Sequence, residues 1–345
     1  MSLRLGILGA TGLVGRTMLA VLEQRDFPVG ELRLLASGRA EERTQRFHGR
    51  EVAVVPVTEQ AFAGLDVVLG AVANPLAERW VPVARAAGAV VVDNSSAFRY
   101  HDDVPLVVPE VNGTLLAGRP GLVANPNCST IGIVLALAPL ARAAGLRRVV
   151  TSTYQSVSGA GSEALEELER GVRAGLEGDP PARADGLPPF AFNVVPHIDR
   201  FLDNGYTREE MKVAWETRKI LGLPGLPVTC TAVRVPVRVG HAAAVHAVFD
   251  RPLSPQEARA LWAAFPGLEV VDDPAAALYP TPLAAAGRDA TLVGRARADL
   301  DDPHGLEFFV CSDNLRKGAA LNAVQIAEVR FGVGRAAAPP GGRRP

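Results

Sequence analysis

A chain of 345 residues is long enough for two domains, and its formal net charge of -1 argues against a protein that binds nucleic-acid phosphates. Hydrophobic residues make up 48% and charged residues 21% of the chain, and no apolar run reaches the roughly 18 residues of a membrane span. The three cysteines, Cys128, Cys230 and Cys311, are a sparse, odd set typical of a reducing compartment. We therefore expect a cytoplasmic protein with no nucleic-acid and no membrane partner.

The first 127 residues alternate apolar runs with amphipathic segments. The runs predict strands, which we place at residues 3–8, 31–37, 51–57, 65–72 and 89–95. Helices are expected between them, at 11–23 and 75–87. Near-continuous apolar strands separated by helices are typical of a parallel sheet that is buried on both faces. The prediction is an α/β fold whose N-terminal domain, residues 1–127, is doubly wound and Rossmann-like.

Longer strand-like runs follow from residue 147, at 147–157, 228–239, 242–250 and 304–313. They favour a second, α+β domain at 128–313 with a mixed or antiparallel sheet. A helix at 314–333 is expected to return to the first domain and complete it. Residues 178–189 are predicted to form a loop. The Pro- and Gly-rich tail 334–345 cannot bury a core and is expected to be disordered.

Glycines follow the first strand at Gly6, Gly9, Gly12 and Gly15. A glycine turn between a strand and a helix lets the backbone approach a pyrophosphate at the helix N-terminus, although a plain tight turn remains the alternative. The second strand then ends in Ser37 and Arg39, where an acid would hold the ribose of NAD. A hydroxyl and a guanidinium suit a 2'-phosphate, so NADP is predicted. The alternative for Arg39 is a solvated loop residue.

Cys128 lies in "ANPNCST", directly before an apolar, helix-like run. Pro126 favours an extended backbone before it, and Asn127 can cap a helix at 129–143. The helix N-terminus favours a thiolate, which beside a nicotinamide suggests attack on a carbonyl followed by hydride transfer. The alternative is a buried, inert cysteine, and we assign that state to Cys230 and Cys311.

Several motifs in this order resemble the aspartate-semialdehyde dehydrogenase family over nearly the whole chain. They are "GATGLVG", "VVDNSSAFR", "NPNCST", "YQSVSGAG", "REEMKVAWETRKIL", "VRVPVRVGH" and "SDNLRKGAALNAVQIAE". The resemblance implies reversible, NADP-dependent reductive dephosphorylation of L-4-aspartyl phosphate to L-aspartate 4-semialdehyde. The reaction would serve the biosynthesis of lysine and diaminopimelate, methionine and threonine. A homodimer or dimer of dimers, built through the second domain, is also implied.

The resemblance also assigns roles to residues. Cys128 matches the nucleophile that carries a thioester, and His241 matches the general acid/base that protonates the thiohemiacetal oxygen. The matching substrate residues, which would hold the acyl, carboxylate, ammonium and phosphate groups, are Arg99, Asn127, Gln155, Glu209, Lys212 and Arg234. The matching cofactor residues are Gly9, Thr11, Gly12, Leu13, Val14, Ser158, Gly159 and Asn314. Inorganic phosphate is the implied co-substrate, and no metal is expected.

Two departures and two alternatives accompany this assignment. Ala242 and Ala243 follow His241 where the family often has Ser-Glu, and Asn74-Pro75 replaces a small Ser/Gly loop. One alternative is a sister reductase for another acyl phosphate or an acyl-CoA. The other is a catalytically silent homologue that acts as a binding protein, which the presence of both Cys128 and His241 disfavours.

Overall fold

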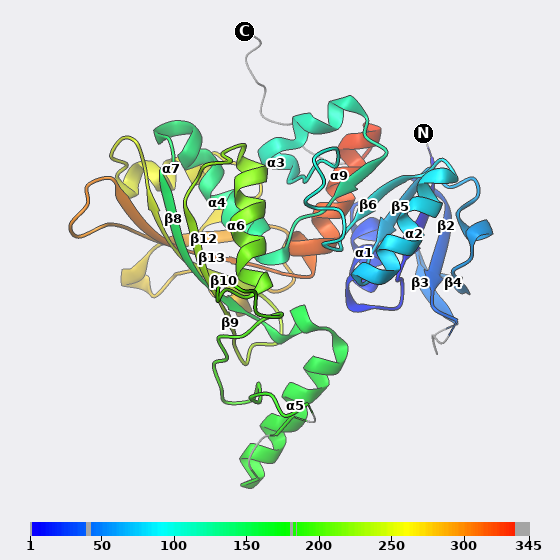
Figure 1. Ribbon diagram of the computed structural model, residues 1–345, viewed down its shortest axis with the longest axis horizontal. Helices are drawn as coiled ribbons and strands as arrows, with labels where there is room; N and C mark the ends of the chain where they lie inside the picture. The colour runs from blue at the N-terminus through cyan, green and yellow to red at the C-terminus, as the bar shows by residue number, and fades with distance from the viewer. Residues whose placement is uncertain (1, 39–42, 180–181, 184, 335–345) are drawn as a thin grey trace. The chain divides into compact units, whose positions relative to one another are not determined.

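The computed structural model describes residues 2–38, 43–179, 182–183 and 185–334, and the chain divides into two compact units (Figure 1). Unit 1 comprises residues 1–127 and 319–345, and unit 2 comprises residues 128–318. The predicted tail from residue 335 onward lies outside the described residues, as do Arg39 and residues 180, 181 and 184 of the predicted loop. Within the described ranges, no helix has both the length and the apolar character needed to cross a membrane.

Unit 1 is built on a seven-stranded sheet with the order β3-β4-β2-β1-β5-β6-β7 (Figure 1). The strands are β1 (Leu3–Leu8), β2 (Val29–Ala36), β3 (Thr44–Phe47), β4 (Arg50–Pro56), β5 (Val67–Gly70), β6 (Val90–Asp93) and β7 (Leu122–Ala124). All neighbouring pairs are parallel except β3 and β4, which are antiparallel. Without β3 this is the strand order of a doubly wound, dinucleotide-binding sheet, which confirms the predicted fold class.

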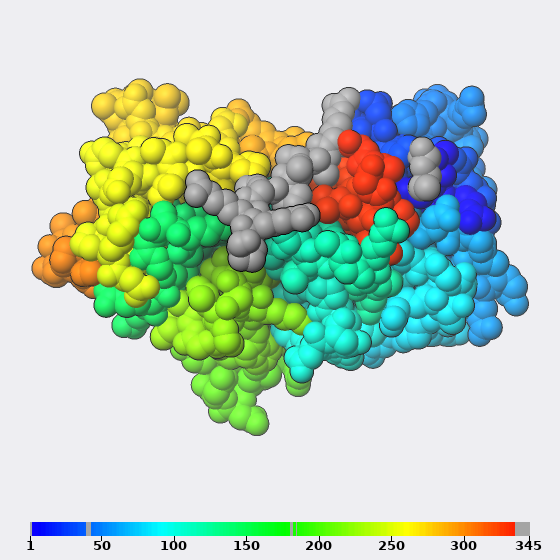
Figure 2. All heavy atoms as spheres, turned by 90° about the horizontal axis from the view of Figure 1, so that it is seen from above, coloured from blue at the N-terminus to red at the C-terminus, as the bar shows by residue number. Residues whose placement is uncertain are grey.

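The helices of unit 1 are α1 (Leu13–Gln24), α2 (Asn74–Ala86), α3 (Pro109–Asn112) and α9 (Leu321–Phe331). Met18 and Leu22 of α1 share one apolar cluster with Leu321 and Val324 of α9 and with the strands, so the two helices cover the sheet together. Figure 2 shows α9 beside the segment that carries α3, where Gln325 donates a hydrogen bond to a Glu110 carboxylate oxygen at 3.1 Å. The last helix therefore packs on residues about 200 positions earlier in the chain.

Unit 2 contains a six-stranded sheet with the order β11-β12-β13-β10-β8-β9. The strands are β8 (Arg148–Gln155), β9 (Val228–Arg234), β10 (His241–Val248), β11 (Leu268–Val270), β12 (Thr291–Ala298) and β13 (Gly305–Ser312). Pairs β8·β9 and β11·β12 are parallel and the others are antiparallel, so the sheet is mixed, as predicted. The register sets Gln155 opposite Arg234, and His241 opposite Ser312.

Helices cover one face of this sheet. They are α4 (Cys128–Ala144), α6 (Arg208–Leu221) and α7 (Pro255–Ala263); α5 (Ser162–Glu177) and the short α8 (Pro282–Ala285) lie elsewhere in the unit (Figure 1). Leu137, Val213 and Trp262, one from each covering helix, pack against Val245 and Phe308 of the strands. The buried Trp262 indole also donates a hydrogen bond to the carbonyl of Ala136, at 2.9 Å. These contacts fix the start of α4 against the sheet.

The strand predicted over 228–239 ends at Arg234. Pro236 has no N–H to continue the ladder, and the chain turns there, with the Val237 N–H bonded to the Val235 carbonyl at 2.8 Å. The final predicted helix begins as a π-helical segment, Arg316–Ala320, which leads into α9.

Candidate functional site

Cys128 is the first residue of α4 and is only partly buried. Gly318 lies against it so closely that a Cβ on the glycine would stand 3.1 Å from the Cys128 Cβ. The N-terminal end of a helix carries partial positive charge, which favours a thiolate over a thiol. Cys230 and Cys311 differ, because burial raises the pKa of both thiols far above the ordinary range. Only Cys128 therefore combines access with a setting that favours the reactive form.

Arg234, at the end of β9, supplies a positive charge beside this sulfur. Its guanidinium is buried, donates to the Ser156 carbonyl at 2.8 Å, and interacts electrostatically with Glu209 and Cys128. Burial lowers the pKa of Arg234, and those two acidic partners oppose the change. An arginine stays charged after a shift in this direction, so the site keeps a cation next to the nucleophile.

His241 begins β10 and is 2% exposed. The backbone N–H of Ser156 points at its Nδ1, with 3.0 Å between the two nitrogens. Its Nε2 is buried and has no hydrogen-bond partner among the described residues. Burial, assisted by the charge of Arg234, holds the pKa of His241 well below its ordinary value. The ring is therefore neutral near pH 7.

A polar network lies behind the histidine. The Oδ1 of Asn314 accepts hydrogen bonds from the Gly240 N–H at 2.9 Å, from the Ser156 hydroxyl at 3.0 Å and from the Ser158 hydroxyl at 3.3 Å. The Asn314 amide returns a hydrogen bond to Ser158 Oγ at 2.9 Å. Ser158 and Asn314 were predicted to contact the cofactor. In this structure both are buried, and they fix the turn before His241 to the end of β8.

Gly159 faces the same space as the catalytic candidates. A Cβ at this position would stand 3.1 Å from Arg234 Nη1 and 3.2 Å from His241 Nε2. Both distances are shorter than ordinary van der Waals contact, so a side chain here would push on two functional groups. The absence of a side chain therefore leaves room beside the Nε2 of His241 and the Arg234 guanidinium.

A chain of charged and amide groups extends from β8 to α6. Gln155 Nε2 donates to Glu209 Oε1 at 3.2 Å, and Lys212 Nζ donates to Glu209 Oε2 at 3.1 Å. Lys212 also pairs with Asp199 at 2.7 Å. The spacing of Glu209 and Lys212 does place both on one helix face, as the sequence indicated.

A capping box fixes the helix end that carries this pair. The backbone N–H of Thr207 donates to Glu210 Oε2 at 2.6 Å, and the Glu210 N–H donates to Thr207 Oγ1 at 3.3 Å. Glu210 Oε1 accepts a further hydrogen bond from the Ala232 N–H on β9, at 3.0 Å. The start of α6 is thereby attached to the strand that leads to Arg234.

Asp199 is a site residue that the sequence did not indicate. Burial would raise its pKa, but the Lys212 ammonium and the Arg200 N–H lower it below the ordinary value. Burial would likewise lower the pKa of Lys212, and the carboxylates of Glu209 and Asp199 hold it above the ordinary value instead. Lys212 is thus charged and shared between two acids. No sequence motif surrounds Asp199. It lies in a loop outside α6, has a positive φ of 68°, and contacts Lys212 from there.

In unit 1 the predicted glycine turn connects β1 to α1. Gly9 has a φ of 89°, and a Cβ there would stand 2.4 Å from the Ala71 carbonyl oxygen, so only glycine fits. Helix α1 starts at Leu13, has no acidic residue in its first turn, and its N-cap residue Gly12 offers no side-chain cap. The turn and helix end therefore suit an anion, as the predicted role of Gly9, Thr11, Gly12, Leu13 and Val14 requires. Ser37 is exposed just after β2, and Arg39 lies outside the described residues.

Arg99 is held at the carboxyl ends of β6 and β7. It donates to the Asn125 carbonyl at 2.9 Å and to the Asn94 carbonyl at 2.7 Å. Nearby, burial raises the pKa of Asp93, and hydrogen bonds from Ser95 and the charge of Arg99 offset this only in part. Asn127 is buried and belongs to unit 1 with Arg99, whereas the other candidate substrate residues belong to unit 2.

The divergent Asn74-Pro75 segment has a local role. Asn74 begins α2 and exchanges hydrogen bonds with Ser96, whose N–H donates to Asn74 Oδ1 at 3.0 Å. Asn74 Nδ2 donates to Ser96 Oγ at 2.9 Å. Asn74, which differs from the family pattern, therefore connects the loop after β5 to the loop after β6.

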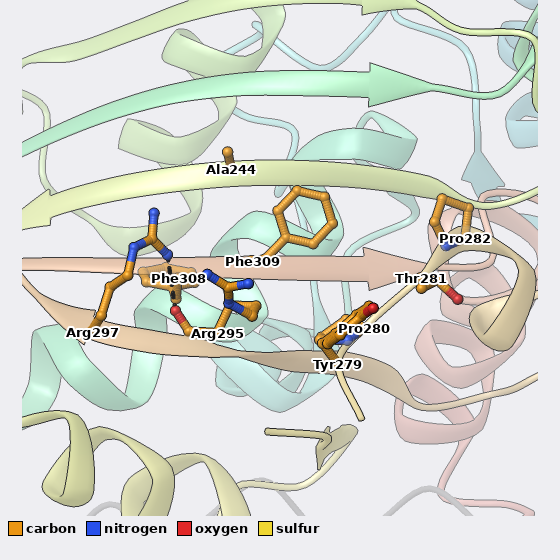
Figure 3. A pocket seen from close by; sticks show the side chains of 9 residues that line it. All are labelled: Ala244, Tyr279, Pro280, Thr281, Pro282, Arg295, Arg297, Phe308 and Phe309. Atoms are coloured by element: carbon orange, nitrogen blue, oxygen red, sulfur yellow. Dashed lines mark hydrogen bonds between the residues drawn. The ribbon is translucent and has the colours of Figure 1, made fainter. Parts of the chain in front are cut away.

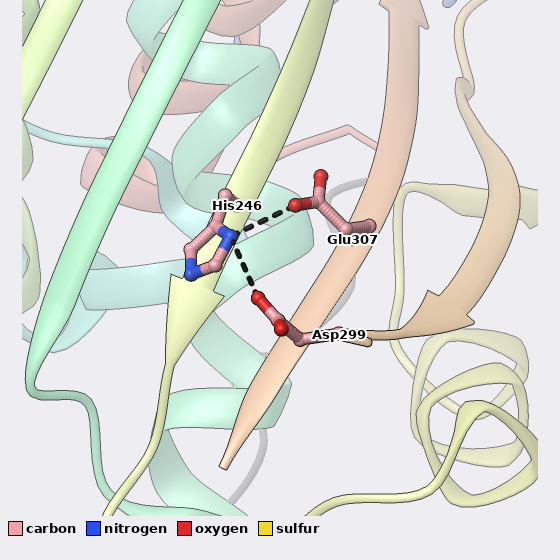
Figure 4. Close-up of side chains that lie close together, drawn as sticks. All are labelled: His246, Asp299 and Glu307. Atoms are coloured by element: carbon pink, nitrogen blue, oxygen red, sulfur yellow. Dashed lines mark hydrogen bonds and ion pairs between the residues drawn. The ribbon is translucent and has the colours of Figure 1, made fainter. Parts of the chain in front are cut away.

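The open face of the unit 2 sheet carries two further features. A cavity of about 470 Å³ is lined by Ala244, Phe309 and Arg297 among others, and alternation along β10 directs Ala244 away from the face of His241 (Figure 3). On the same strands His246 Nδ1 lies 2.8 Å from Glu307 and 3.4 Å from Asp299 (Figure 4). An imidazole N–H between two carboxylates accounts for this cluster without an ion.

Comparisons with known proteins agree with this geometry. Residues 4–118 match the family model described as semialdehyde dehydrogenase, NAD binding domain, and residues 137–317 match semialdehyde dehydrogenase, dimerisation domain. An aspartate-semialdehyde dehydrogenase of Legionella pneumophila is 49% identical over 95% of both chains.

Solved structures give the same result. Aspartate-semialdehyde dehydrogenase II of Vibrio cholerae, complexed with ASA, has a TM-score of 0.92 and 45% identity, covering 96% of this chain and 98% of its own. The enzyme of Candida albicans with NADP has a TM-score of 0.72 and 25% identity, covering 95% and 98% of the two chains.

Proposed function

We propose a mechanism for this chain from the premise that it belongs to the aspartate-semialdehyde dehydrogenase family, whose model domains and relatives match nearly its full length. The chain is an oxidoreductase that interconverts L-4-aspartyl phosphate and L-aspartate 4-semialdehyde with a nicotinamide cofactor. One observation supports our assignment of the chemistry to unit 2. The cation Arg234 and the Nε2 of His241 lie together beside Gly159, and Arg234 also interacts electrostatically with the nucleophile candidate Cys128.

In the reductive direction, the Cys128 thiolate attacks the acyl carbon of aspartyl phosphate. The new C–S bond forms a thioester, and the C–O bond to phosphate breaks with its electron pair on the departing oxygen. The positive end of α4 and the charge of Arg234 stabilise the thiolate before the attack. After reduction of the acyl carbon, the C–S bond breaks, the pair returns to sulfur, and the aldehyde leaves.

The substrate has an anionic and a cationic part, and the site offers a partner for each. We propose that Arg234 binds the α-carboxylate and Glu209 the ammonium group, with Gln155 orienting the acyl group through its bond to Glu209. Arg99 and Lys212 are proposed to bind the phosphate, and Asn127 to contact the substrate. Inorganic phosphate is then the co-substrate of the reverse reaction.

The cofactor site is proposed at the carboxyl end of β1. The Gly9 turn and the N-terminus of α1, which has no side-chain cap, fit a pyrophosphate, which Gly9, Thr11, Gly12, Leu13 and Val14 would hold. A reduced nicotinamide, when bound, supplies the hydride that reduces the acyl carbon. We propose NADP rather than NAD, because β2 ends in Ala36, Ser37 follows it, and no acid stands there to hold a free ribose hydroxyl.

The proposed assembly is a homodimer, or a dimer of dimers, formed through the open face of the unit 2 sheet. Tyr154, Leu278 and Tyr279 are exposed in this unit at 36%, 55% and 42%, which suits burial by a second copy. The protein is proposed to act in the cytoplasm, where three cysteines that form no disulfide would stay reduced, in the synthesis of lysine, diaminopimelate, methionine and threonine.

The activity test uses the purified chain with L-aspartate 4-semialdehyde, phosphate and either NADP or NAD. We expect phosphate-dependent reduction of NADP, with a lower kcat/KM for NAD, and loss of turnover by more than about a thousandfold in Cys128→Ala. Equal turnover of N-acetylglutamate semialdehyde, or dependence on CoA instead of phosphate, would favour a sister reductase. An inactive wild-type chain, or an active Cys128→Ala variant, would contradict the mechanism.

A further inference from the structure

The segment 312–318, which starts at the end of β13, lies against the start of α4 at two points. A Cβ on Gly318 would stand 3.1 Å from the Cys128 Cβ and 3.2 Å from the Cys128 carbonyl oxygen. Further along α4, a Cβ on Gly132 would stand 3.0 Å from Ser312 Oγ. All three distances are shorter than ordinary van der Waals contact, so neither point has room for a side chain. A displacement of this segment would therefore move the base of the Cys128 side chain.

The same segment also holds the histidine. Ser312 pairs with His241 across β13 and β10. Asn314 Oδ1 accepts a hydrogen bond at 2.9 Å from the N–H of Gly240, the residue directly before His241. The elements that carry Cys128 and His241 are therefore both attached to one short stretch of chain, whose shape helps to set the distance between the two side chains.

Asp313 fixes the shape of this segment. Its side chain is buried, and its Oδ1 accepts hydrogen bonds from the N–H groups of Leu315 at 2.8 Å and Arg316 at 2.9 Å. Its Oδ2 accepts a third, from the Gly287 N–H at 2.7 Å. The Asp313 carbonyl accepts the Gly318 N–H at 2.9 Å, in the spacing of a π-helix. Hydrogen bonds to a carboxylate are stronger than those between neutral groups, so one side chain closes the turn that ends at Gly318.

The loop that Asp313 binds supports the histidine from a second side. The Pro282 carbonyl oxygen, at the start of α8, lies so close to Gly240 that a Cβ there would stand 2.6 Å from it. Gly287, which follows α8, is the residue that donates to Asp313 Oδ2. The two oxygens of Asp313 thus join the segment 312–318 to the loop that packs on the turn before His241.

We propose that Asp313 is a positioning residue for the reaction, which holds the segment 312–318 so that the Cys128 sulfur and the His241 imidazole reach the same acyl group. This inference rests on the proposed function and adds a residue to it. Asp313 acts through the backbone in this proposal and contacts no reacting atom. Correct placement of two groups raises the rate of the chemical step, so loss of the carboxylate should lower kcat far more than it raises the KM for the semialdehyde.

Steady-state kinetics and urea unfolding of Asp313→Asn test the proposal. Asparagine keeps the size of the side chain, but its NH₂ group cannot accept a hydrogen bond from a backbone N–H. The matched control is Asp272→Asn, because Asp272 is another buried carboxylate of unit 2 that accepts two backbone N–H groups, from Arg295 at 2.7 Å and Ala296 at 3.1 Å. Both variants should unfold at a lower urea concentration than wild type.

Only the Asp313 variant should lose turnover. We expect kcat to fall about 10- to 100-fold in Asp313→Asn, with the KM for the semialdehyde within about twofold of wild type, and both constants to stay within about twofold in Asp272→Asn. A wild-type kcat in Asp313→Asn, or a raised KM with kcat retained, would overturn the proposal. Wild-type turnover is measured first, so a failure of the proposed function is distinguished from a failure of this inference.

A double-variant cycle separates positioning from a general loss of structure. Gly318→Ala presses on Cys128 from the segment that Asp313 holds, and by itself it should lower kcat about tenfold. A segment released by Asp313→Asn can yield to the new methyl group, so the combined loss should be at least about threefold smaller than the product of the single losses. Asp272→Asn with Gly318→Ala should give the product within about twofold. The full product in both pairs, or a wild-type kcat in Gly318→Ala, would overturn the proposal even where Asp313→Asn folds poorly.

Discussion

Replacing Gly159 by alanine tests whether this position keeps space open for His241 and Arg234. The new Cβ would stand 3.1 Å from Arg234 Nη1 and 3.2 Å from His241 Nε2, about 0.3 and 0.2 Å short of ordinary contact at 3.4 Å. Misplacing a catalytic group by about 1 Å lowers the rate about a hundredfold. Displacements of about 0.3 and 0.2 Å in two groups should therefore together lower kcat about tenfold. The overpacking should also lower the free energy of unfolding by about 1 kcal/mol.

Steady-state kinetics and urea unfolding of Gly159→Ala measure both effects. The matched control is Gly225→Ala, because Gly225 lies in the same unit, has no positive φ and would meet nothing within 4 Å. We expect a lower kcat in Gly159→Ala and no change in the control. A wild-type kcat with a raised KM for NADP alone would refute this reasoning and would support the sequence-based assignment of Gly159 to the cofactor.

Three further variants test other parts of the site. Thr207→Ala should lower the free energy of unfolding, measured by urea titration, by about 1 kcal/mol, because it removes the capping box of α6. The variant should also raise the KM for the semialdehyde, because the capping box positions Glu209. Unchanged stability would contradict the role of the capping box. Asp199→Asn should lower the KM for phosphate by up to about fivefold, since Lys212 loses a competing acid, and a raised KM would be the opposite result. Wild type should lose stability relative to His241→Gln as pH falls below about 6.5, by at most about 1.4 kcal/mol per pH unit. The sign follows because the unfolded histidine takes up a proton that the buried ring, with its lowered pKa, refuses; a constant difference would contradict this.

The pattern of apolar residues predicted the strands in the interior of the sheets but missed strands at their edges. The buried strands of unit 1, such as Leu3–Leu8 and Val90–Asp93, are near-continuous apolar runs and were predicted. Strand β3, Thr44–Phe47, is exposed at alternate residues and polar at three of its four positions, and β7 has three residues, so neither gives a clear signal. Strand β12 was missed for a similar reason, because its second half reads Arg-Ala-Arg-Ala.

The chemistry of the site was readable from residue types, but its connections were not. Cys128 and His241 stand in motifs, and the helix start at Cys128 follows from Pro126. The bond from the Ser156 N–H to His241 depends on a turn after β8 that no residue pattern specifies. Asp199 likewise reaches Lys212 only through the folded loop, 13 residues away in sequence. Tertiary packing decides both contacts.

The central claim is that Cys128 holds the aspartyl group as a thioester, and mass spectrometry of the enzyme mixed with aspartyl phosphate in the absence of NADPH tests it most directly. The account predicts an aspartyl adduct on the peptide that contains Cys128, release of phosphate in equal amount, and loss of the adduct as aldehyde when NADPH is added. The Cys128→Ser variant should give no such thioester. No adduct in wild type, or an adduct on Cys230 or Cys311, would contradict the account.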